Sequence, residues 1–284
     1  MHGKTTTFGV IGAGQMGAGI AQVAAASGMN VILQDISADF VDRGLAIIAK
    51  NLQRSVEKGK IAESEKKAII GRIVPSTQIV NMEAADFVVE AASEIEEIKF
   101  KIFAQLDEIC PPHAILSSNT SSIPIGRIAS RTKRPDKVIG MHFMNPVPVM
   151  KLVEVIRALT TSVETYLTTV ELAERMGKIP AVASDFPGFI ANRILLPMIN
   201  EAIFCLYQGV GDKDSIDRVM QLGMNHPMGP LALADLIGLD TCLAILNTLH
   251  QGIGDPKYRP CPLLRQYVES GWLGRKTGRG FYSY

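Results

Sequence analysis

The sequence predicts an α/β protein in which a doubly wound N-terminal domain precedes an all-helical C-terminal domain. A glycine-rich turn near the N-terminus stands between an apolar run and an Ala-rich stretch. Short apolar runs then alternate with helical segments up to about residue 187, and only helical periodicity follows the Pro187-Gly188 pair. We therefore expect two domains, residues 1–187 and 188–284, a division that suits a chain of 284 residues.

The N-terminal elements are arranged as a strand, a glycine turn and a helix. The apolar run at residues 8–11 is followed by Gly12-Ala13-Gly14-Gln15-Met16-Gly17 and then by the Ala-rich stretch, which reaches Ser27. In the dinucleotide-binding fingerprint the first glycine permits the tight turn, the second lets the backbone approach a pyrophosphate, and the third lets the helix pack on the strand. The positive end of the helix then faces the pyrophosphate. The turn therefore predicts a Rossmann-type domain that binds a nucleotide.

A second apolar run, residues 31–33, ends at Gln34-Asp35. An acid at about this distance beyond the glycines can accept hydrogen bonds from the ribose hydroxyls, and its charge would repel the 2′-phosphate of NADP. Asp35 therefore predicts NAD as the cofactor. The alternative is a strand-end carboxylate that only faces water.

The later elements continue the alternation that a doubly wound domain requires. Strands are expected at residues 87–90, 115–118 and 138–141, and residues 39–72 are expected to be helical with a break near Gly59. In the C-terminal domain the periodicity predicts four helices, at residues 191–207, 213–222, 231–251 and 263–270.

Composition and charge exclude several other classes of protein. Hydrophobic residues make up 47% and charged residues 20% of the chain, as in an ordinary folded protein, and a net charge of +1 provides no general attraction to nucleic acid or to an anionic membrane. The four cysteines have no metal-ligand spacing, so no metal site is expected. The N-terminus leaves no room for a signal peptide before the first strand, and no apolar run approaches the ~20 residues of a membrane span. We expect a soluble, cytoplasmic protein.

Residues 140–154 contain a histidine and a carboxylate that could meet, His142 and Glu154. An imidazole with an ordinary pKa of about 6.5 can accept a proton, and a neighbouring carboxylate fixes its tautomer and stabilises the imidazolium. The pair therefore predicts a general base. The alternatives are a histidine buried in the core or a loop, and a solvated glutamate on a strand.

Taken together, these motifs resemble those of the short-chain L-3-hydroxyacyl-CoA dehydrogenases, in particular the bacterial 3-hydroxybutyryl-CoA dehydrogenases. The match runs nearly end to end. It includes residues 12–17, 90–94 with Lys99, 118–122, 142–154, 187–189 with 192–193, 225–230 and 274–278.

The resemblance implies that the 3-hydroxyl group of an acyl-CoA is oxidised by passing hydride to NAD. His142 would take the hydroxyl proton and Glu154 would orient the imidazole. Ser121 and Asn192 would donate hydrogen bonds to the substrate's 3-oxygen, although both could simply be turn or helix caps. The resemblance also implies that four further residues line the NAD site, Glu94, Lys99, Asn145 and Lys276.

Lys50, Arg54 and Lys58 are spaced four residues apart and share one face of the predicted helix. A basic face of this kind can pair with the phosphates of coenzyme A, or it can simply be solvated. The resemblance implies a homodimer as well. Two other functions remain open: a hydroxyacid or L-gulonate-type dehydrogenase that does not use CoA, and a non-catalytic NAD-binding structural protein.

Overall fold

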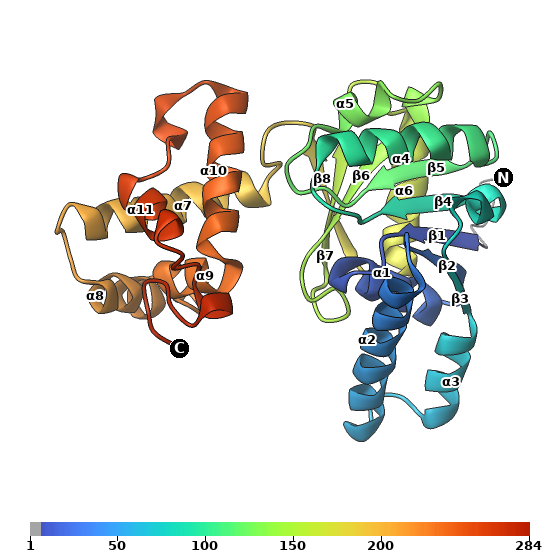
Figure 1. The fold of residues 1–284 in the computed structure, drawn as a ribbon, viewed down its shortest axis with the longest axis horizontal. Helices are drawn as coiled ribbons and strands as arrows, with labels where there is room; N and C mark the ends of the chain where they lie inside the picture. Colours follow the sequence, from blue (N-terminus) through green and yellow to red (C-terminus); the bar gives the residue numbers. More distant parts are fainter. Residues whose placement is uncertain (1–6) are drawn as a thin grey trace. The chain divides into compact units, whose positions relative to one another are not determined.

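The computed structural model describes residues 7–284 and divides between Phe186 and Pro187 into two compact units (Figure 1). The first six residues, on which the expectation of no signal peptide rests, lie outside the described residues. The unit that ends at Phe186 contains the whole sheet, and the unit Pro187–Tyr284 is helical. The α/β fold class predicted from the sequence is confirmed.

An eight-stranded sheet crosses the first unit in the order β3-β2-β1-β4-β5-β6-β7-β8. All neighbouring strands pair in parallel except β6 and β7, which are antiparallel. The order reverses between β1 and β4, so the chain segments that follow these two strands diverge and leave room for a ligand. The strands are β1 (Thr7–Ile11), β2 (Asn30–Gln34), β3 (Ile73–Ser76), β4 (Phe87–Glu90), β5 (Ile115–Ser118), β6 (Val138–Phe143), β7 (Leu152–Arg157) and β8 (Ile179–Ser184).

Helices cover both faces of this sheet. Right-handed crossovers run in opposite directions on the two sides of the reversal, which places α1 and α4 on opposite faces. The break expected near Gly59 is present, because α2 ends at Glu57 and Gly59 has a φ of 65°. The helices are α1 (Gln15–Ala26), α2 (Ala38–Glu57), α3 (Glu63–Gly71), α4 (Glu96–Ile109), α5 (Ile125–Ala129) and α6 (Val163–Arg175), with short 3₁₀ turns η1 (Ile79–Ala84) and η2 (Pro135–Lys137).

Three strands were not expected from the sequence, namely β3, β7 and β8. β3 and β8 are the two edges of the sheet, where burial is incomplete and the apolar pattern is correspondingly interrupted. β3 contains Pro75, and Ile179 and Val182 of β8 are 61% and 46% exposed. Edge strands of this kind are recognised only once their neighbour in the sheet is known.

The second unit packs its helices around a core of its own, which includes Leu196, Leu231 and Leu246. One expected helix is corrected: residues 231–251 form two helices bent by 98°, because Gly238 between them has a φ of 104° that no helix accommodates. The last part of the helix expected at 213–222 is a π-helical turn. The elements are α7 (Ala191–Tyr207), α8 (Lys213–Arg218), η3 (Val219–Gly223), α9 (Pro230–Ile237), α10 (Leu239–Ile253), η4 (Pro256–Tyr258), α11 (Pro262–Glu269) and η5 (Arg275–Thr277).

Two buried carboxylates organise this helical unit. Asp217 accepts hydrogen bonds from the backbone N–H groups of Leu231 and Ala232 at the start of α9, at 2.8 and 3.0 Å. Asp235 accepts from the N–H groups of Phe281 and Tyr282 at 3.0 and 2.9 Å. The backbone N–H groups at a helix start or in a turn have no partner within the helix or turn itself. Here the two carboxylates accept their hydrogen bonds in place of water.

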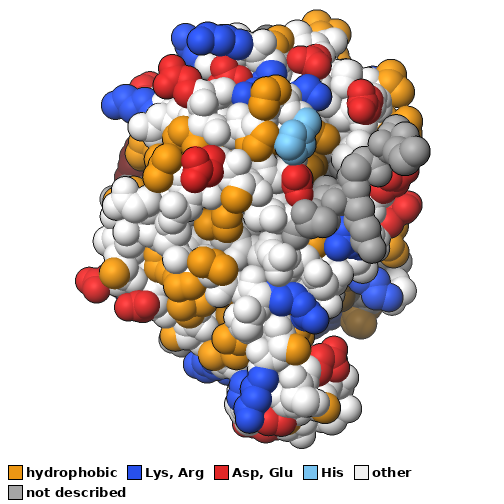
Figure 2. Space-filling view, turned by 90° about the vertical axis from the view of Figure 1, so that its right-hand side faces the viewer, with side chains coloured by type: hydrophobic (Ala, Val, Ile, Leu, Met, Phe, Trp, Pro, Cys, Tyr) orange, Lys and Arg blue, Asp and Glu red, His pale blue; other side chains and the backbone are white. Residues whose placement is uncertain are grey.

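Across residues 7–284, no single helix has the length and hydropathy of a membrane span, and α9 with α10 passes that criterion only as a bent pair. Figure 2 looks at the side that lies on the right of Figure 1. On it, acidic and basic side chains are interspersed with each other and with groups of hydrophobic side chains, as a net charge of +1 implies.

Candidate functional site

The glycine turn after β1 has little space for side chains at its first and last glycine. A Cβ added to Gly12, whose φ is 96°, would lie 2.6 Å from the Ala91 carbonyl oxygen, and one added to Gly17 would lie 1.7 Å from the carbonyl oxygen of Gly12. No heavy atom lies within 4 Å of the position of a Cβ at Gly14. The outer glycines are therefore required by the fold, whereas the middle one leaves backbone open to a ligand.

A cavity of about 790 Å³ opens beside this turn. Its lining comes from the segments that follow β1, β2, β3 and β4 and from the facing sides of α2 and α4. Asp35, directly after β2, projects into it and accepts hydrogen bonds from the N–H groups of Ala13 and Ile36, both at 2.7 Å. The size of the cavity, the backbone N–H groups of the glycine turn and the Asp35 carboxylate together fit the adenosine diphosphate half of a dinucleotide.

His142 and Glu154 lie directly opposite each other on the antiparallel strands β6 and β7. The distance from His142 Nδ1 to Glu154 Oε2 is 2.8 Å, and the two side chains are 12% and 2% exposed. The strand pairing explains the contact, because side chains of opposed residues in an antiparallel pair point to the same face. A nearly buried carboxylate therefore fixes the orientation of the imidazole.

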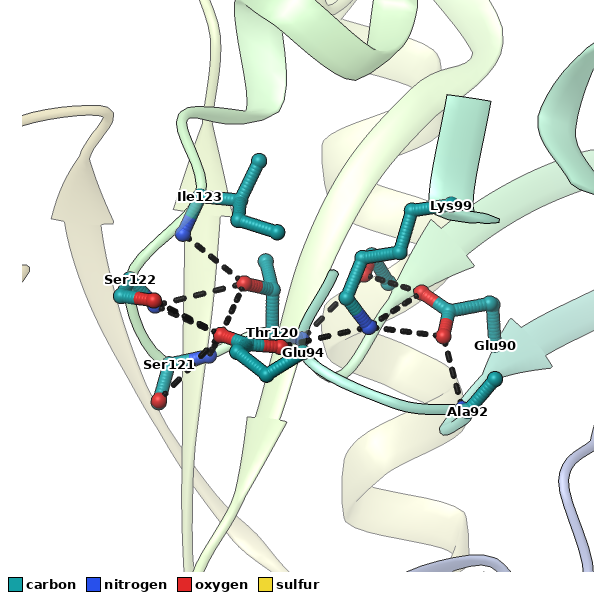
Figure 3. Close-up of polar contacts among 9 residues, drawn as sticks. Glu90, Ala92, Glu94, Lys99, Thr120, Ser121, Ser122 and Ile123 are labelled. Atoms are coloured by element: carbon teal, nitrogen blue, oxygen red, sulfur yellow. Dashed lines mark hydrogen bonds and ion pairs between the residues drawn. The ribbon is translucent and has the colours of Figure 1, made fainter. Parts of the chain in front are cut away.

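A single glutamate, Glu94, organises the polar turn after β5 (Figure 3). Its Oε1 accepts hydrogen bonds from the Thr120 hydroxyl at 2.6 Å, from the Ser121 N–H at 2.9 Å and from the Ser122 hydroxyl at 2.9 Å. The Ser121 hydroxyl lies 3.3 Å from the same oxygen. The orientation of Ser121 is thus set by a residue that is 27 positions earlier in the chain.

Charge compensation for Glu94 comes from Lys99, whose side chain is 1% exposed. The Lys99 ammonium lies 3.3 Å from Glu94 and 2.7 Å from the buried Glu90, whose second oxygen accepts from the Ser118 hydroxyl at 2.6 Å. Partial burial raises the pKa of Glu94, but the Lys99 ammonium and the hydrogen bonds from the turn outweigh it and hold the pKa below its ordinary value. The turn therefore rests on an ionised carboxylate.

The segment between β6 and β7 contains Asn145 and is tied to two other parts of the unit. Gln15, at the start of α1, donates a hydrogen bond to the Asn145 side-chain oxygen at 3.0 Å. The buried Lys178 donates to the carbonyl oxygens of Val147 and Met150. Burial lowers the pKa of Lys178. No pattern in the sequence indicates this role, since a lone lysine has the pattern of an ordinary surface charge.

The remaining expected site residues lie on α2 and in the helical unit. Lys50 and Arg54 are exposed on α2, and Lys58 is the exposed residue directly after the helix. Asn192 is in the first turn of α7 and is 9% exposed. Lys276, in η5, forms an ion pair of 2.5 Å with Asp240.

Comparison with known proteins assigns both units to one family. Residues 7–186 match the NAD-binding domain of 3-hydroxyacyl-CoA dehydrogenase, and residues 188–284 match its C-terminal domain. The chain belongs to the 3-hydroxyacyl-CoA dehydrogenase family. It is therefore an oxidoreductase whose cofactor is NAD, and the resemblance noted in the sequence is confirmed.

Relatives of this dehydrogenase match it over nearly the whole chain. A protein of Bacillus subtilis named "Probable 3-hydroxybutyryl-CoA dehydrogenase" is 61% identical over 97% of this chain and 96% of its own length. The 3-hydroxybutyryl-CoA dehydrogenase of Clostridioides difficile is 50% identical over 97% of this chain and 98% of its own length. The crystal structure of (S)-3-hydroxybutyryl-CoA dehydrogenase from Ralstonia eutropha matches with a TM-score of 0.97 and 49% identity over 99% of each chain.

Proposed function

We propose that the protein interconverts (S)-3-hydroxybutyryl-CoA and acetoacetyl-CoA by hydride transfer to and from NAD. The observation that carries the proposal is the 2.8 Å contact between His142 and Glu154, in the same unit as the cofactor cavity. A protein that only bound the nucleotide would have no use for an imidazole held by a buried carboxylate. The names of its relatives supply the substrate class, a 3-hydroxyacyl thioester of coenzyme A.

His142 is the proposed general base for oxidation and general acid for reduction. With the Nδ1 hydrogen donated to Glu154, the neutral imidazole has its lone pair on Nε2, which takes the proton from the 3-hydroxyl group. The Glu154 carboxylate then stabilises the imidazolium that forms. NAD, when bound, supplies the hydride acceptor.

Ser121 and Asn192 are the proposed donors to the substrate's 3-oxygen. In the reduction direction, such donors polarise the carbonyl and stabilise the charge that develops on its oxygen. The assignment of Ser121 is supported by the hydrogen bonds that Glu94 accepts from its turn, which keep the hydroxyl in a defined position. Asn192 would contribute from the C-terminal domain, which we take as residues 188–284, while residues 1–187 form the cofactor-binding domain.

We assign the cofactor contacts in two groups. The turn from Gly12 to Gly17 is the proposed pyrophosphate site, and Asp35 is the proposed partner of the adenosine ribose. Four further residues are proposed to line the remainder of the NAD site: Glu94, Lys99, Asn145 and Lys276. Lys99 would act through Glu94, because its ammonium is buried between Glu90 and Glu94.

The phosphates of coenzyme A are the proposed partners of Lys50, Arg54 and Lys58. The assignment is supported by the exposure of all three side chains along α2 and its C-terminal end. Coenzyme A is anionic at its 3′-phosphate and pyrophosphate, so an exposed row of cations would favour the thioester over the unesterified acid.

Reduction of acetoacetyl-CoA, followed as NADH oxidation, tests the proposed function. Free acetoacetate and NADPH are run as parallel controls. Rapid turnover that requires both the thioester and NADH is the expected result. Turnover of a free hydroxyacid or of L-gulonate instead would support a dehydrogenase that does not use CoA. No turnover by a protein that still binds NADH would support a structural NAD-binding protein.

We propose further that the protein is a cytoplasmic homodimer, joined through the helical unit. Support comes from the exposed apolar side chains of Val210, Val219 and Leu222, which are 73%, 58% and 80% exposed, beside an apolar cavity of about 510 Å³. Leu222→Glu is expected to shift the sedimentation coefficient to that of a monomer. Val163→Glu, an equivalent change on α6, is the control, and an unchanged dimer in Leu222→Glu would contradict the assignment.

A further inference from the structure

Of the described side chains that line the cofactor cavity, two are charged: Asp35 and Arg43. Every other lining residue is apolar, a glycine, or a neutral polar residue. Arg43 lies on α2, eight residues after Asp35, and is exposed to solvent. An arginine in this cavity is not explained by NAD, whose adenosine ribose has hydroxyl groups and no phosphate at its 2′ and 3′ positions.

The guanidinium of Arg43 is held in place by its own helix. Its Nε donates to the Asp39 carbonyl oxygen at 3.2 Å, and its central carbon lies 5.0 Å from the centre of the Phe40 ring. These contacts involve Nε and the planar face, so the two terminal nitrogens are the ones suited to a ligand. A guanidinium held in this way loses less side-chain entropy when it binds an anion.

The carboxylate of Asp35, which lines the same cavity, is also held in place by hydrogen bonds. Asp35 accepts from the N–H groups of Ala13 and Ile36, both at 2.7 Å, so it cannot turn away from the turn that holds the pyrophosphate. A 2′-phosphate on a ribose held by Asp35 would lie beside the negative charge of that carboxylate. The cavity is thus lined by one group that repels a phosphate and by one whose charge attracts it.

We propose that Arg43 forms a binding site for the 2′-phosphate of NADP, and that the charge of Asp35 keeps this site from being used. Selectivity for NAD then depends on one repulsive carboxylate, and a phosphate-binding group is already present. The inference rests on the proposed assignment of Asp35 to the adenosine ribose. Guanidinium and phosphate match in geometry and charge, and a hydrogen bond to a charged group changes affinity by about 10- to 100-fold.

The test is a binding cycle that does not depend on turnover. Dissociation constants for NADH and NADPH are measured by fluorescence titration for the wild type, Asp35→Asn, Arg43→Gln and the double variant. We expect Asp35→Asn to tighten NADPH binding at least about tenfold. Adding Arg43→Gln should reverse most of that gain, while NADH affinity changes by less than about threefold. The NADPH affinity of Asp35→Asn should also fall more steeply with salt than that of the double variant.

Two results would overturn the role of Arg43. One is an unchanged NADPH affinity when Arg43→Gln is added to Asp35→Asn. The other is an equal loss for NADH and NADPH, which would make Arg43 a partner of the shared adenosine. Lys67→Gln, an exposed charge removal on α3 outside the cavity lining, controls for the general effect of net charge.

The assignment of Asp35 to the adenosine ribose is tested independently of the role of Arg43. If Asp35→Asn left both cofactor affinities unchanged, the carboxylate would not be the ribose partner. A selective loss of NADPH affinity in Arg43→Gln alone would still support the phosphate site in that case, and its absence would contradict it.

Discussion

The pairing of His142 with Glu154 places an imidazole beside a carboxylate that water barely reaches. Their Nδ1 to Oε2 distance of 2.8 Å and the 2% exposure of the Glu154 side chain keep the imidazole in one orientation and place a carboxylate against Nδ1. The proposed chemistry needs both properties, because Nε2 of the imidazole must accept a proton in the oxidation direction and return it in the reduction direction.

Replacement of His142 by Gln is expected to lower kcat by about 10²- to 10⁴-fold, the usual contribution of a general base. The dissociation constant of NADH should stay nearly unchanged, because the imidazole acts on the substrate proton. Steady-state kinetics and a separate NADH titration provide the two measurements. Near-normal turnover would remove His142 from the mechanism, and lost NADH binding would point to a damaged fold.

A pH-dependent contribution to stability is expected from Glu94. Its pKa lies below the ordinary value of 4.5 in the folded protein, so the unfolded chain binds more protons as the pH falls. Its stabilising effect should therefore be complete above about pH 4.5 and disappear as the pH falls through the lowered pKa.

Urea unfolding of wild type and Glu94→Gln across this pH range checks the expectation. The difference in the free energy of unfolding should be largest at neutral pH and shrink in acid. Glu97→Gln, at an exposed residue in the first turn of α4, is the control. A difference between wild type and Glu94→Gln that did not vary with pH would contradict an ionised Glu94 as the anchor of the turn.

Among the elements, the segment between β6 and β7 connects the strand of His142 to the glycine turn. Asn145 is bonded to Gln15 at the start of α1, and the same segment packs so closely on that helix that a Cβ at Gly19 would lie 2.8 Å from Val147. Lys178 fixes the segment from the other side through two carbonyl oxygens. The position of this segment therefore depends on contacts from α1 and from Lys178.

Lys178→Met should loosen this segment. The free energy of unfolding is expected to fall by about 1–3 kcal/mol, because the carbonyl oxygens of Val147 and Met150 lose a buried donor. The KM for NADH should rise more than kcat falls, since Asn145 is proposed to contact the cofactor while His142 is held separately by Glu154. Lys151→Met, an exposed lysine beside β7, is the matched control. Equal effects of the two substitutions would show that Lys178 has no special role.

Secondary structure was predictable where burial is regular. The strands β1, β2, β4, β5 and β6 are close to their expected bounds, since each lies between two neighbouring strands and nearly all of its residues are buried. β3 and β8 lie at the edges and lack this signal. The division of residues 231–251 into two helices depends on the backbone of Gly238, which periodicity does not report.

At the scale of the whole molecule, two units have separate cores, and the chain end belongs to the second. Asp235, 1% exposed, accepts from two backbone N–H groups near the C-terminus and from the Tyr284 hydroxyl at 3.1 Å. Glycines at 274 and 280 pack against it, where a Cβ would lie 2.3 and 1.9 Å from its atoms. The C-terminal segment is therefore an integral part of the helical unit.

Asp235→Asn is expected to destabilise this unit by about 1–3 kcal/mol, because one oxygen becomes an amide group that cannot accept from the backbone. Hydrogen exchange followed by mass spectrometry should show faster exchange in residues 274–284 and unchanged exchange in β1 and β4. Asp214→Asn, an exposed change on α8, is the control. Acceleration spread evenly over both units would contradict a local role for Asp235.

The α/β class, the nucleotide turn with its cofactor, and the family follow from the sequence alone, because each depends on residue types at short, fixed spacings. The sequence also indicated His142 and Glu154, twelve residues apart. Three further features are visible only in the folded chain: Glu94 anchors the turn of Ser121, Lys178 holds the Asn145 segment, and Arg43 shares a cavity with Asp35. These are contacts between side chains on different elements, and their energies depend on burial and distance, which no local pattern contains.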